Sequence, residues 1–184
     1  MEAKHLKAVV AFVAAKKSPI LRGILVDFDN RRLVATDSSA IIVVDLDESD
    51  MYGTGKVVVP VEYFEKAIKE AGKQSIIISN EKIGNVAYEA KELETPDGYR
   101  NFPRYERVLP TEEEELDDQN FCMYKSKYLK MMENTIEAFG GDVEVDSIVK
   151  TGALYARGAE RGYSTTRLWE IVIMPFMYKK RNHR

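Results

Sequence analysis

Few side chains in this sequence have the types and spacing that catalysis or metal binding requires. The two histidines, His5 and His183, lie on a predicted helix and in a basic tail, and neither has metal-ligand spacing. The single cysteine, Cys122, has no neighbouring base that would make it a nucleophile. The Gly-Thr-Gly at 53–55 lacks the lysine and the spacing of a phosphate-binding loop. We therefore expect a protein that is not an enzyme and that uses no metal and no cofactor.

The most specific pattern in the chain is the segment NFPRYERVLP, residues 101–110. It contains two prolines, aromatic residues on either side of Pro103, alternating charge and an apolar Val-Leu pair near its end. A turn signal, TPDG at 95–98, precedes it, and an acidic run, TEEEELDD at 111–118, follows it. A second apolar segment with a proline, EIVIMPF, lies at 170–176. Neither composition is that of an ordinary connector.

The composition is that of a soluble globular protein, since 45% of its 184 residues are hydrophobic and 31% are charged. This length allows one large domain, or one domain with a fragment of another. A net charge of −3 excludes a globally basic nucleic-acid binder but is compatible with a locally basic surface. The apolar runs are shorter than the roughly 20 residues of a membrane span, and the N-terminus lacks a signal-peptide cleavage pattern. With the single cysteine, these features predict a cytoplasmic protein with no membrane partner.

Helical and strand periodicities recur in three units along the chain. Each unit combines one amphipathic helix with several strands rich in β-branched residues. The expected elements are helix 2–17 with strands 20–28, 33–37 and 40–46; strand 55–60 with helix 61–72 and strands 75–80 and 85–90; and strand 120–124 with helix 125–141 and strands 142–149, 152–158 and 168–176. Because neither a one-sided helix nor a half-buried sheet is stable alone, the units must pack together, and the predicted fold class is α+β.

Three segments resemble, in the same order, three segments of the bacterial DNA polymerase sliding clamp, the β-clamp family of processivity factors. They are RRLVATDSSAIIVV at 31–44, NFPRYERVLP at 101–110 and IVIMPF at 171–176. The predicted helix at 125–141 is also similar to the last helix of the family. The resemblance implies a DNA-clamp-like α+β fold of three helix-plus-antiparallel-strand units.

The resemblance also implies how the chain is divided. Residues 1–110 are similar to a complete middle domain of the family, made of units 1–48 and 55–110. An acidic linker at 111–119 leads to a half domain at 120–178, which is similar to the second half of the last domain, and residues 179–184 form a basic tail. The family's first domain and the first half of its last domain have no counterpart in this sequence.

In the family, the linker, the middle-domain turn and the chain end converge on a hydrophobic pocket that binds a short extended peptide of polymerases and other replication or repair proteins. Prolines would give such a pocket rigid walls, and a methionine would let one wall adapt to different peptides. Two departures affect it here: Phe176 stands where methionine is common, and Ser38-Ser39-Ala40 replaces Gly-His-Arg. The positions that match the pocket motifs are Leu21, Thr36, Ser38, Ile41, Pro103, Arg107, Val108, Val172, Met174, Pro175 and Phe176.

The family's ring is lined by helices whose basic side chains face double-stranded DNA and contact its phosphates without reading bases. The matching candidates are Lys4, Lys7, Lys16, Lys17, Lys66, Lys69, Lys73, Lys125, Lys127 and Lys130. Ordinary surface lysines on amphipathic helices would have the same pattern. An odd number of units leaves the third without a partner inside the chain, so we expect a homo-oligomer in which third units of two copies pair.

Three interpretations stay open from the sequence. The favoured one is a clamp-like accessory protein of DNA replication, from a phage or mobile element, that binds the clamp-binding peptides of a DNA polymerase or other replication or repair proteins. The second is an oligomeric processivity clamp that encircles DNA. The third is a clamp-fold structural or interaction protein that binds neither DNA nor peptide.

Overall fold

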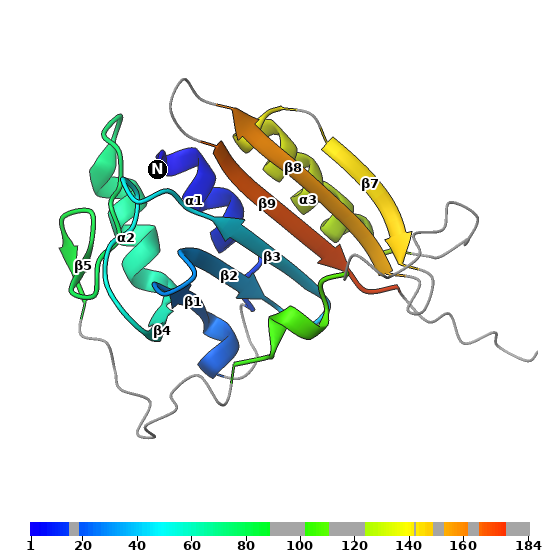
Figure 1. Cartoon of the computed structure of the whole chain (residues 1–184), viewed down its shortest axis with the longest axis horizontal. Helices are drawn as coiled ribbons and strands as arrows, with labels where there is room; N and C mark the ends of the chain where they lie inside the picture. Colours follow the sequence, from blue (N-terminus) through cyan, green and yellow to red (C-terminus); the bar gives the residue numbers. More distant parts are fainter. Residues whose placement is uncertain are drawn as a thin grey trace, which may run out of the picture.

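The computed structural model describes residues 1–14, 19–88, 102–110, 124–141, 143–148, 153–161 and 166–175. Within these ranges, α-helices lie along one face of a seven-stranded antiparallel sheet, and a small hairpin lies beside it (Figure 1). This architecture confirms the α+β, clamp-like fold class predicted from the sequence.

The helices are α1 (Ala3–Val10), α2 (Val61–Ala71) and α3 (Ser126–Phe139), with short helical turns η1 (Pro19–Arg22) and η2 (Tyr105–Arg107). The strands are β1 (Gly23–Asp27), β2 (Arg32–Thr36), β3 (Ala40–Asp45), β4 (Lys56–Pro60), β5 (Lys82–Ile83), β6 (Val86–Ala87), β7 (Val143–Ile148), β8 (Ala153–Arg161) and β9 (Thr166–Ile173). In the part of the chain that the structure describes, no helix has the length and apolar character needed to cross a bilayer.

The third predicted unit joins the first inside one sheet. The strand order is β4-β1-β2-β3-β9-β8-β7, and the junction is the antiparallel pair β3–β9, with Ile41 opposite Val172. On the helix side, α1 packs against both α2 and α3. The expectation that the third unit lacks a partner inside the chain is therefore wrong, because β9 covers the apolar edge that β3 would otherwise expose. The proposed division into a domain, a linker and a half domain stays a prediction.

The first unit begins differently from the prediction. The expected helix at 2–17 is shorter, since α1 ends at Val10 and the next residues form turns. The strand expected at 20–28 begins only at Gly23, because η1 occupies the preceding residues. A Cβ at Gly23 would lie 2.5 Å from a methyl group of Val58, so the glycine lets β1 and β4 approach closely.

The second unit contains less regular structure than expected. In place of strands at 75–80 and 85–90, the chain forms the short hairpin β5–β6, in which Gly84 has a φ of 58°. The Ser79 hydroxyl accepts backbone hydrogen bonds just before this hairpin, so the segment turns instead of extending. The strand expected at 120–124 falls outside the described residues except for Tyr124, which is not in a strand.

Side chains alternate between the two faces of the sheet, and each face has its own apolar cluster. The face beneath the helices holds the larger core, which includes Trp169, Phe12 and Phe64. The opposite face, called the outer face below, holds a second cluster in which Phe102 and Tyr105 cover residues of the sheet. Full burial of a Phe or Leu side chain stabilises a protein by about 1.5–3 kcal/mol, so both faces contribute to stability.

Candidate binding site on the outer face

The segment 102–110, called the linker segment below and distinct from the acidic linker at 111–119, folds onto the outer face, where two aromatic side chains anchor it. Phe102 is 2% exposed and Tyr105 is fully buried, and both pack in one cluster with Leu25 and Val34 of the sheet. The η2 turn follows, with the Val108 N–H donating to the Tyr105 carbonyl at 3.0 Å. The aromatic residues that make this segment unusual in the sequence are therefore its anchors.

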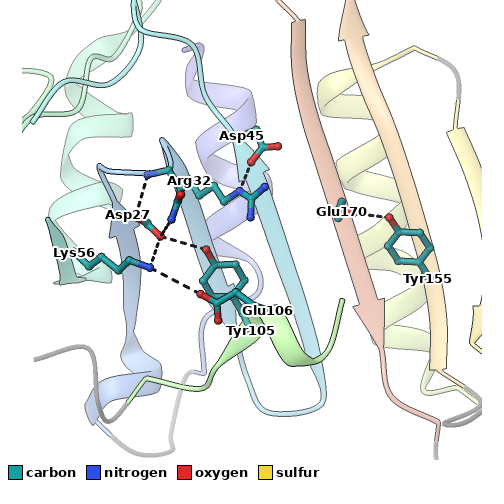
Figure 2. A network of polar contacts seen from close by, with 9 residues as sticks. Asp27, Arg32, Asp45, Lys56, Tyr105, Glu106, Tyr155 and Glu170 are labelled. Carbon is teal, nitrogen blue, oxygen red and sulfur yellow. Dashed lines mark hydrogen bonds and ion pairs between the residues drawn. The ribbon is translucent and has the colours of Figure 1, made fainter. Parts of the chain in front are cut away.

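A buried carboxylate on β1 accepts a hydrogen bond from the same segment. The Tyr105 hydroxyl donates a 3.3 Å hydrogen bond to Asp27 Oδ2 (Figure 2). The Asp27 side chain has no exposed surface and also accepts from Lys56 Nζ and from Asn30 Nδ2, each at 2.8 Å. Burial raises the pKa of Asp27, but these hydrogen bonds outweigh it and leave the pKa below its ordinary value. Burial raises the pKa of Tyr105 to about 12, so its hydroxyl keeps the proton that it donates.

Opposite charges alternate across four neighbouring strands on this face. Lys56, Asp27, Arg32 and Asp45 are register neighbours on β4, β1, β2 and β3. Arg32 Nε donates to Asp45 Oδ1 at 2.6 Å, and Lys56 Nζ lies 3.9 Å from Glu106 of the linker segment. Such cross-strand pairs fix the register of a sheet. In the described parts of the chain, no group of three or more His, Cys, Asp or Glu side chains is arranged to hold a metal ion.

Predicted pocket residues meet at the other end of the outer face. Thr36 on β2 lies opposite Ile41 on β3, and Ile41 lies opposite Val172 on β9. Ile41, Val172 and Val108 of the linker segment belong to one apolar cluster. The sheet register and the folded linker thus place three segments that are distant in sequence beside one another.

The turn between β2 and β3 is fixed by its own polar side chains. Thr36 Oγ1 donates to the Ala40 carbonyl at 2.8 Å and accepts from the Ser38 N–H at 3.1 Å. Ser38 has a φ of 74°, in the left-handed region. The Met174 N–H donates to the Ser39 carbonyl at 2.9 Å, which ties the segment after β9 to this turn.

The predicted pocket residues differ in exposure. The buried members are Thr36, Ile41 and Val172; the half-buried members are Leu21, Val108 and Pro175; and the exposed members are Ser38, Pro103, Arg107 and Met174. Leu21 lies in η1, where its carbonyl accepts from the Ala14 N–H at 2.9 Å. Phe176 lies outside the described residues, as do Lys16 and Lys17. Of the described members, Ile41, Val108 and Val172 lie in the outer cluster, and Leu21 is not among its residues.

The sequence interpretation did not assign eight buried residues of this cluster to the site. They are Phe102, Tyr105, Ala153 and Tyr155, together with Leu25, Val34, Val43 and Val58 of the sheet. The Tyr155 hydroxyl donates to Glu170 Oε1 at 2.5 Å (Figure 2), and burial raises the pKa of Tyr155 above its ordinary value. The aromatic spacing around Pro103 is a signal for the first two. For Tyr155 the strand periodicity gives alternation but does not say which face it takes.

The predicted DNA-facing lysines that the structure describes lie in the helices or next to their ends. All eight that the structure describes are exposed. Four of them form ion pairs: Lys4 with Glu2 at 3.5 Å, Lys66 with Glu70 at 3.9 Å, Lys127 with Asp37 at 3.0 Å and Lys130 with Glu133 at 2.9 Å. The helix side therefore presents lysines whose charge is partly balanced by neighbouring carboxylates, and their role stays a prediction.

Solved structures share this arrangement. The DNA polymerase III subunit beta from Pseudomonas aeruginosa matches with a TM-score of 0.58 and 13% identity, over 97% of this chain and 66% of that one. The fold is that of a bacterial sliding clamp. The DNA polymerase III beta chain from Streptococcus pneumoniae matches with a TM-score of 0.55 and 16% identity, over 97% of this chain and 64% of that one. A Helicobacter pylori beta clamp bound to a DNA ligase peptide matches with a TM-score of 0.53 and 11% identity, over 95% of this chain and 63% of that one.

These similarities confirm the clamp fold implied by the three sequence segments. The chain spans less than two thirds of the length of the three clamps. No protein-family model and no curated protein matches the chain.

Proposed function

We propose that this chain is a clamp-like accessory protein of DNA replication that binds short hydrophobic peptides of a polymerase or of other replication or repair proteins. The observation that carries the proposal is the joining of three distant segments in one apolar cluster, through Ile41, Val108 and Val172. A structurally similar clamp binds a DNA ligase peptide, which supports a peptide as the ligand class. The proposal assigns the chain no enzymatic activity.

The exposed and half-buried residues of the proposed site suit a small number of apolar side chains of a peptide. Val108 and Leu109 are partly buried against the outer cluster. Met174, whose N–H donates to the Ser39 carbonyl of the turn, is 38% exposed. A methionine can adopt several conformations at low cost, so it can fit Leu or Phe side chains of different peptides. Ile41 and Val172, beneath the proposed site, are already buried. The peptide must therefore bind over the exposed residues above them, and we expect micromolar affinity.

The test is a fluorescence-anisotropy titration with a labelled Gln-Leu-x-Leu-Phe-type peptide. Wild-type chain is compared with Met174→Ala/Pro175→Ala, and with Tyr52→Ala as a control for loss of an exposed apolar side chain elsewhere. The proposal expects binding by the wild type and the control, and at least about tenfold weaker binding by the double variant. Flat titrations for all three proteins would contradict peptide binding and favour a clamp fold without this activity.

A second candidate function is an oligomeric clamp that encircles double-stranded DNA. The observation in its favour is that all described candidate lysines are exposed on the helix side. Affinity would come from non-specific phosphate contacts and fall with added salt. The discriminating experiment compares retention on circular and on linear DNA at low salt. Retention of the protein on circular DNA alone supports encirclement, and equal release of the protein from circular and linear DNA excludes it.

A further inference from the structure

The outer face has a hollow where the first and third units join, at the end of the β3–β9 pair away from Ile41 and Val172. Its volume is about 480 Å³, which is within the range of pockets that bind ligands. Trp169 belongs to the core beneath the helices, so the alternation of side chains puts its neighbours Leu168 and Glu170 on the outer face. We call the hollow the junction pocket, and its charged lining residues are Arg32, Asp45, Glu144, Arg157 and Glu170.

Each arginine of the junction pocket already has a carboxylate partner. Arg32 Nε donates to Asp45 Oδ1 at 2.6 Å, and Arg157 Nε donates to Glu144 Oε2 at 2.5 Å. Glu170 lies opposite Arg157 in the sheet register but, among the residues that the structure describes, it forms no ion pair. The pocket therefore holds three carboxylates against two guanidinium groups, and its excess charge is negative.

The carboxylate that carries this excess is held in place by one neutral donor. The Tyr155 hydroxyl donates to Glu170 Oε1 at 2.5 Å, and the Glu170 side chain is half-buried. Figure 2 shows Glu170 and Tyr155 on β9 and β8, across from Arg32 and Asp45 on β2 and β3. Since the hydroxyl binds only Oε1, the second oxygen of Glu170 is available to a ligand that donates hydrogen bonds.

Leu168 adds an apolar surface beside these charges. It is 48% exposed and lies opposite Ala159 on β8, whose methyl group is too small to cover it. A lone exposed leucine is common on protein surfaces, but this one lines a pocket in which it borders charged side chains. A ligand that fits the pocket therefore combines an apolar group with a positive charge.

Two other ligand classes fit the pocket less well. An anion would approach three carboxylates and would compete with two of them for arginines that are already paired. A metal ion needs several carboxylate or histidine ligands around one point, and the described residues contain no such group. An arginine side chain of a ligand has neither problem, because its planar guanidinium donates hydrogen bonds to carboxylates in a fixed geometry.

We propose that the junction pocket binds an arginine with an adjacent leucine-like residue from an exposed segment of a partner protein. The guanidinium donates to Glu170, and the apolar neighbour packs on Leu168. This goes beyond the proposed function, because the junction pocket shares no residue with the proposed peptide site. Four residues of β9 separate Leu168 from Val172, which is about 13 Å, so one partner chain can reach both sites.

A fluorescence-anisotropy titration of the full chain with a labelled Gly-Leu-Arg-Leu-Arg-Gly peptide tests the proposal. We expect a Kd of roughly 0.1–1 mM at low salt, at least about fivefold weaker binding of the analogue with Gln for Arg, and weaker binding with added salt. Equal binding of the Arg and Gln peptides overturns the proposal. Tighter binding of an analogue with Glu for Arg also overturns it and would identify the arginines as an anion site.

Two variants locate the binding in the junction pocket. Glu170→Gln keeps an oxygen that accepts from Tyr155 but removes the charge, and Leu168→Ala removes the apolar contact. Each is expected to raise the Kd of the Arg peptide by about fivefold. The matched controls are Glu65→Gln, an exposed carboxylate on α2, and Leu129→Ala, a 39% exposed leucine on α3. If neither pocket variant weakens binding more than its control, the proposal is wrong.

Charge reversal gives a further test that loss of folding cannot imitate. Glu170→Lys turns the excess charge of the junction pocket positive, so this variant is expected to prefer the Glu peptide to the Arg peptide. An unchanged preference contradicts the assigned role of Glu170.

The outcome is separate from that for the proposed function. Met174→Ala/Pro175→Ala is expected to bind the Arg peptide as the wild type does, and a loss of binding in this variant would place the Arg peptide on the other site and overturn the proposal. Flat titrations with the Gln-Leu-x-Leu-Phe-type peptide would leave binding of the Arg peptide unaffected.

Discussion

The Tyr105 hydroxyl and the Asp27 carboxylate, 78 positions apart in the sequence, meet at 3.3 Å beneath the linker segment. Asp27 also binds Lys56, whose ammonium lies 3.9 Å from Glu106 of the same segment. The linker segment is thereby attached to β1 and β4 by one buried aromatic ring and a set of charged contacts. This attachment fixes the backbone that carries the exposed part of the proposed peptide site.

We predict that two variants, Tyr105→Phe and Tyr105→Ala, separate the contribution of the Tyr105 hydroxyl to stability from that of its ring. Phe keeps the packing and loses one hydrogen bond to a carboxylate that has other donors, so the free energy of unfolding should fall by about 1 kcal/mol. Ala also leaves a cavity and should cost about 3–5 kcal/mol. Urea denaturation measures both values. Equal losses for the two variants would contradict the role of the ring as the anchor.

The stability of the protein should fall in acid partly through Asp27. Its folded-state pKa is below its ordinary value, so its contribution to stability is present above about pH 4, the usual Asp pKa, and is lost as the pH falls through the folded-state pKa. Lys56→Met removes the cation that lowers this pKa, so the acid loss should begin at higher pH. Urea midpoints measured from pH 2 to 7 test this. If the urea midpoints of wild type and Lys56→Met depend on pH in the same way, the proposed contribution of the Asp27–Lys56 pair to acid stability is wrong.

The close contact between Gly158 and Trp169 predicts a site that does not tolerate added volume. The two residues pair between β8 and β9, and a Cβ at position 158 would lie 2.5 Å from the Trp169 Cζ2. Gly158→Ala should therefore lower the free energy of unfolding by about 1–3 kcal/mol. Trp169→Phe removes the obstructing part of the indole, so the same change should cost less in that background. A double-mutant cycle without coupling would show that the contact is not the cause.

Much of the fold could be predicted from periodicity, because the longer helices and strands bury one face each. The apolar stripe of 61–72 and the helix at 125–141 correspond closely to α2 and α3. The hairpin at Gly84 was missed, because short polar turns inside an apolar stretch compete with a strand through side-chain hydrogen bonds. The β3–β9 pairing was also missed, since periodicity describes each strand alone and does not name its neighbour.

The candidate site could be predicted only in part, for a related reason. The proline-containing segments indicate where a rigid apolar surface can form, and Ile41, Val108 and Val172 do lie in one cluster. Sequence spacing does not determine how deeply each of these side chains is buried, however. Tyr155 reaches the cluster only through the pairing of β8 with β9, a long-range feature that no local pattern contains.

Asp37 connects the turn of the proposed peptide site to the third unit, and its removal should affect both. Its Oδ2 accepts from the Tyr128 hydroxyl at 2.7 Å, and its Oδ1 accepts from the Ser39 N–H at 3.0 Å. Burial raises the pKa of Asp37, but the hydrogen bonds from Tyr128 and Lys127 outweigh it and leave the pKa below its ordinary value.

We predict that Asp37→Ala lowers the free energy of unfolding by about 1–3 kcal/mol, because it leaves the partly buried Tyr128 hydroxyl and Ser39 N–H without their acceptor. It should also weaken peptide binding, since the Ser39 carbonyl of this turn holds Met174. Lys127→Met is the matched control, because it removes only a side chain that is 58% exposed and should cost less than about 1 kcal/mol. Urea denaturation and peptide anisotropy are measured on both variants. If Asp37→Ala lowers stability but leaves peptide affinity unchanged, the turn stabilises the fold and is not part of the peptide site.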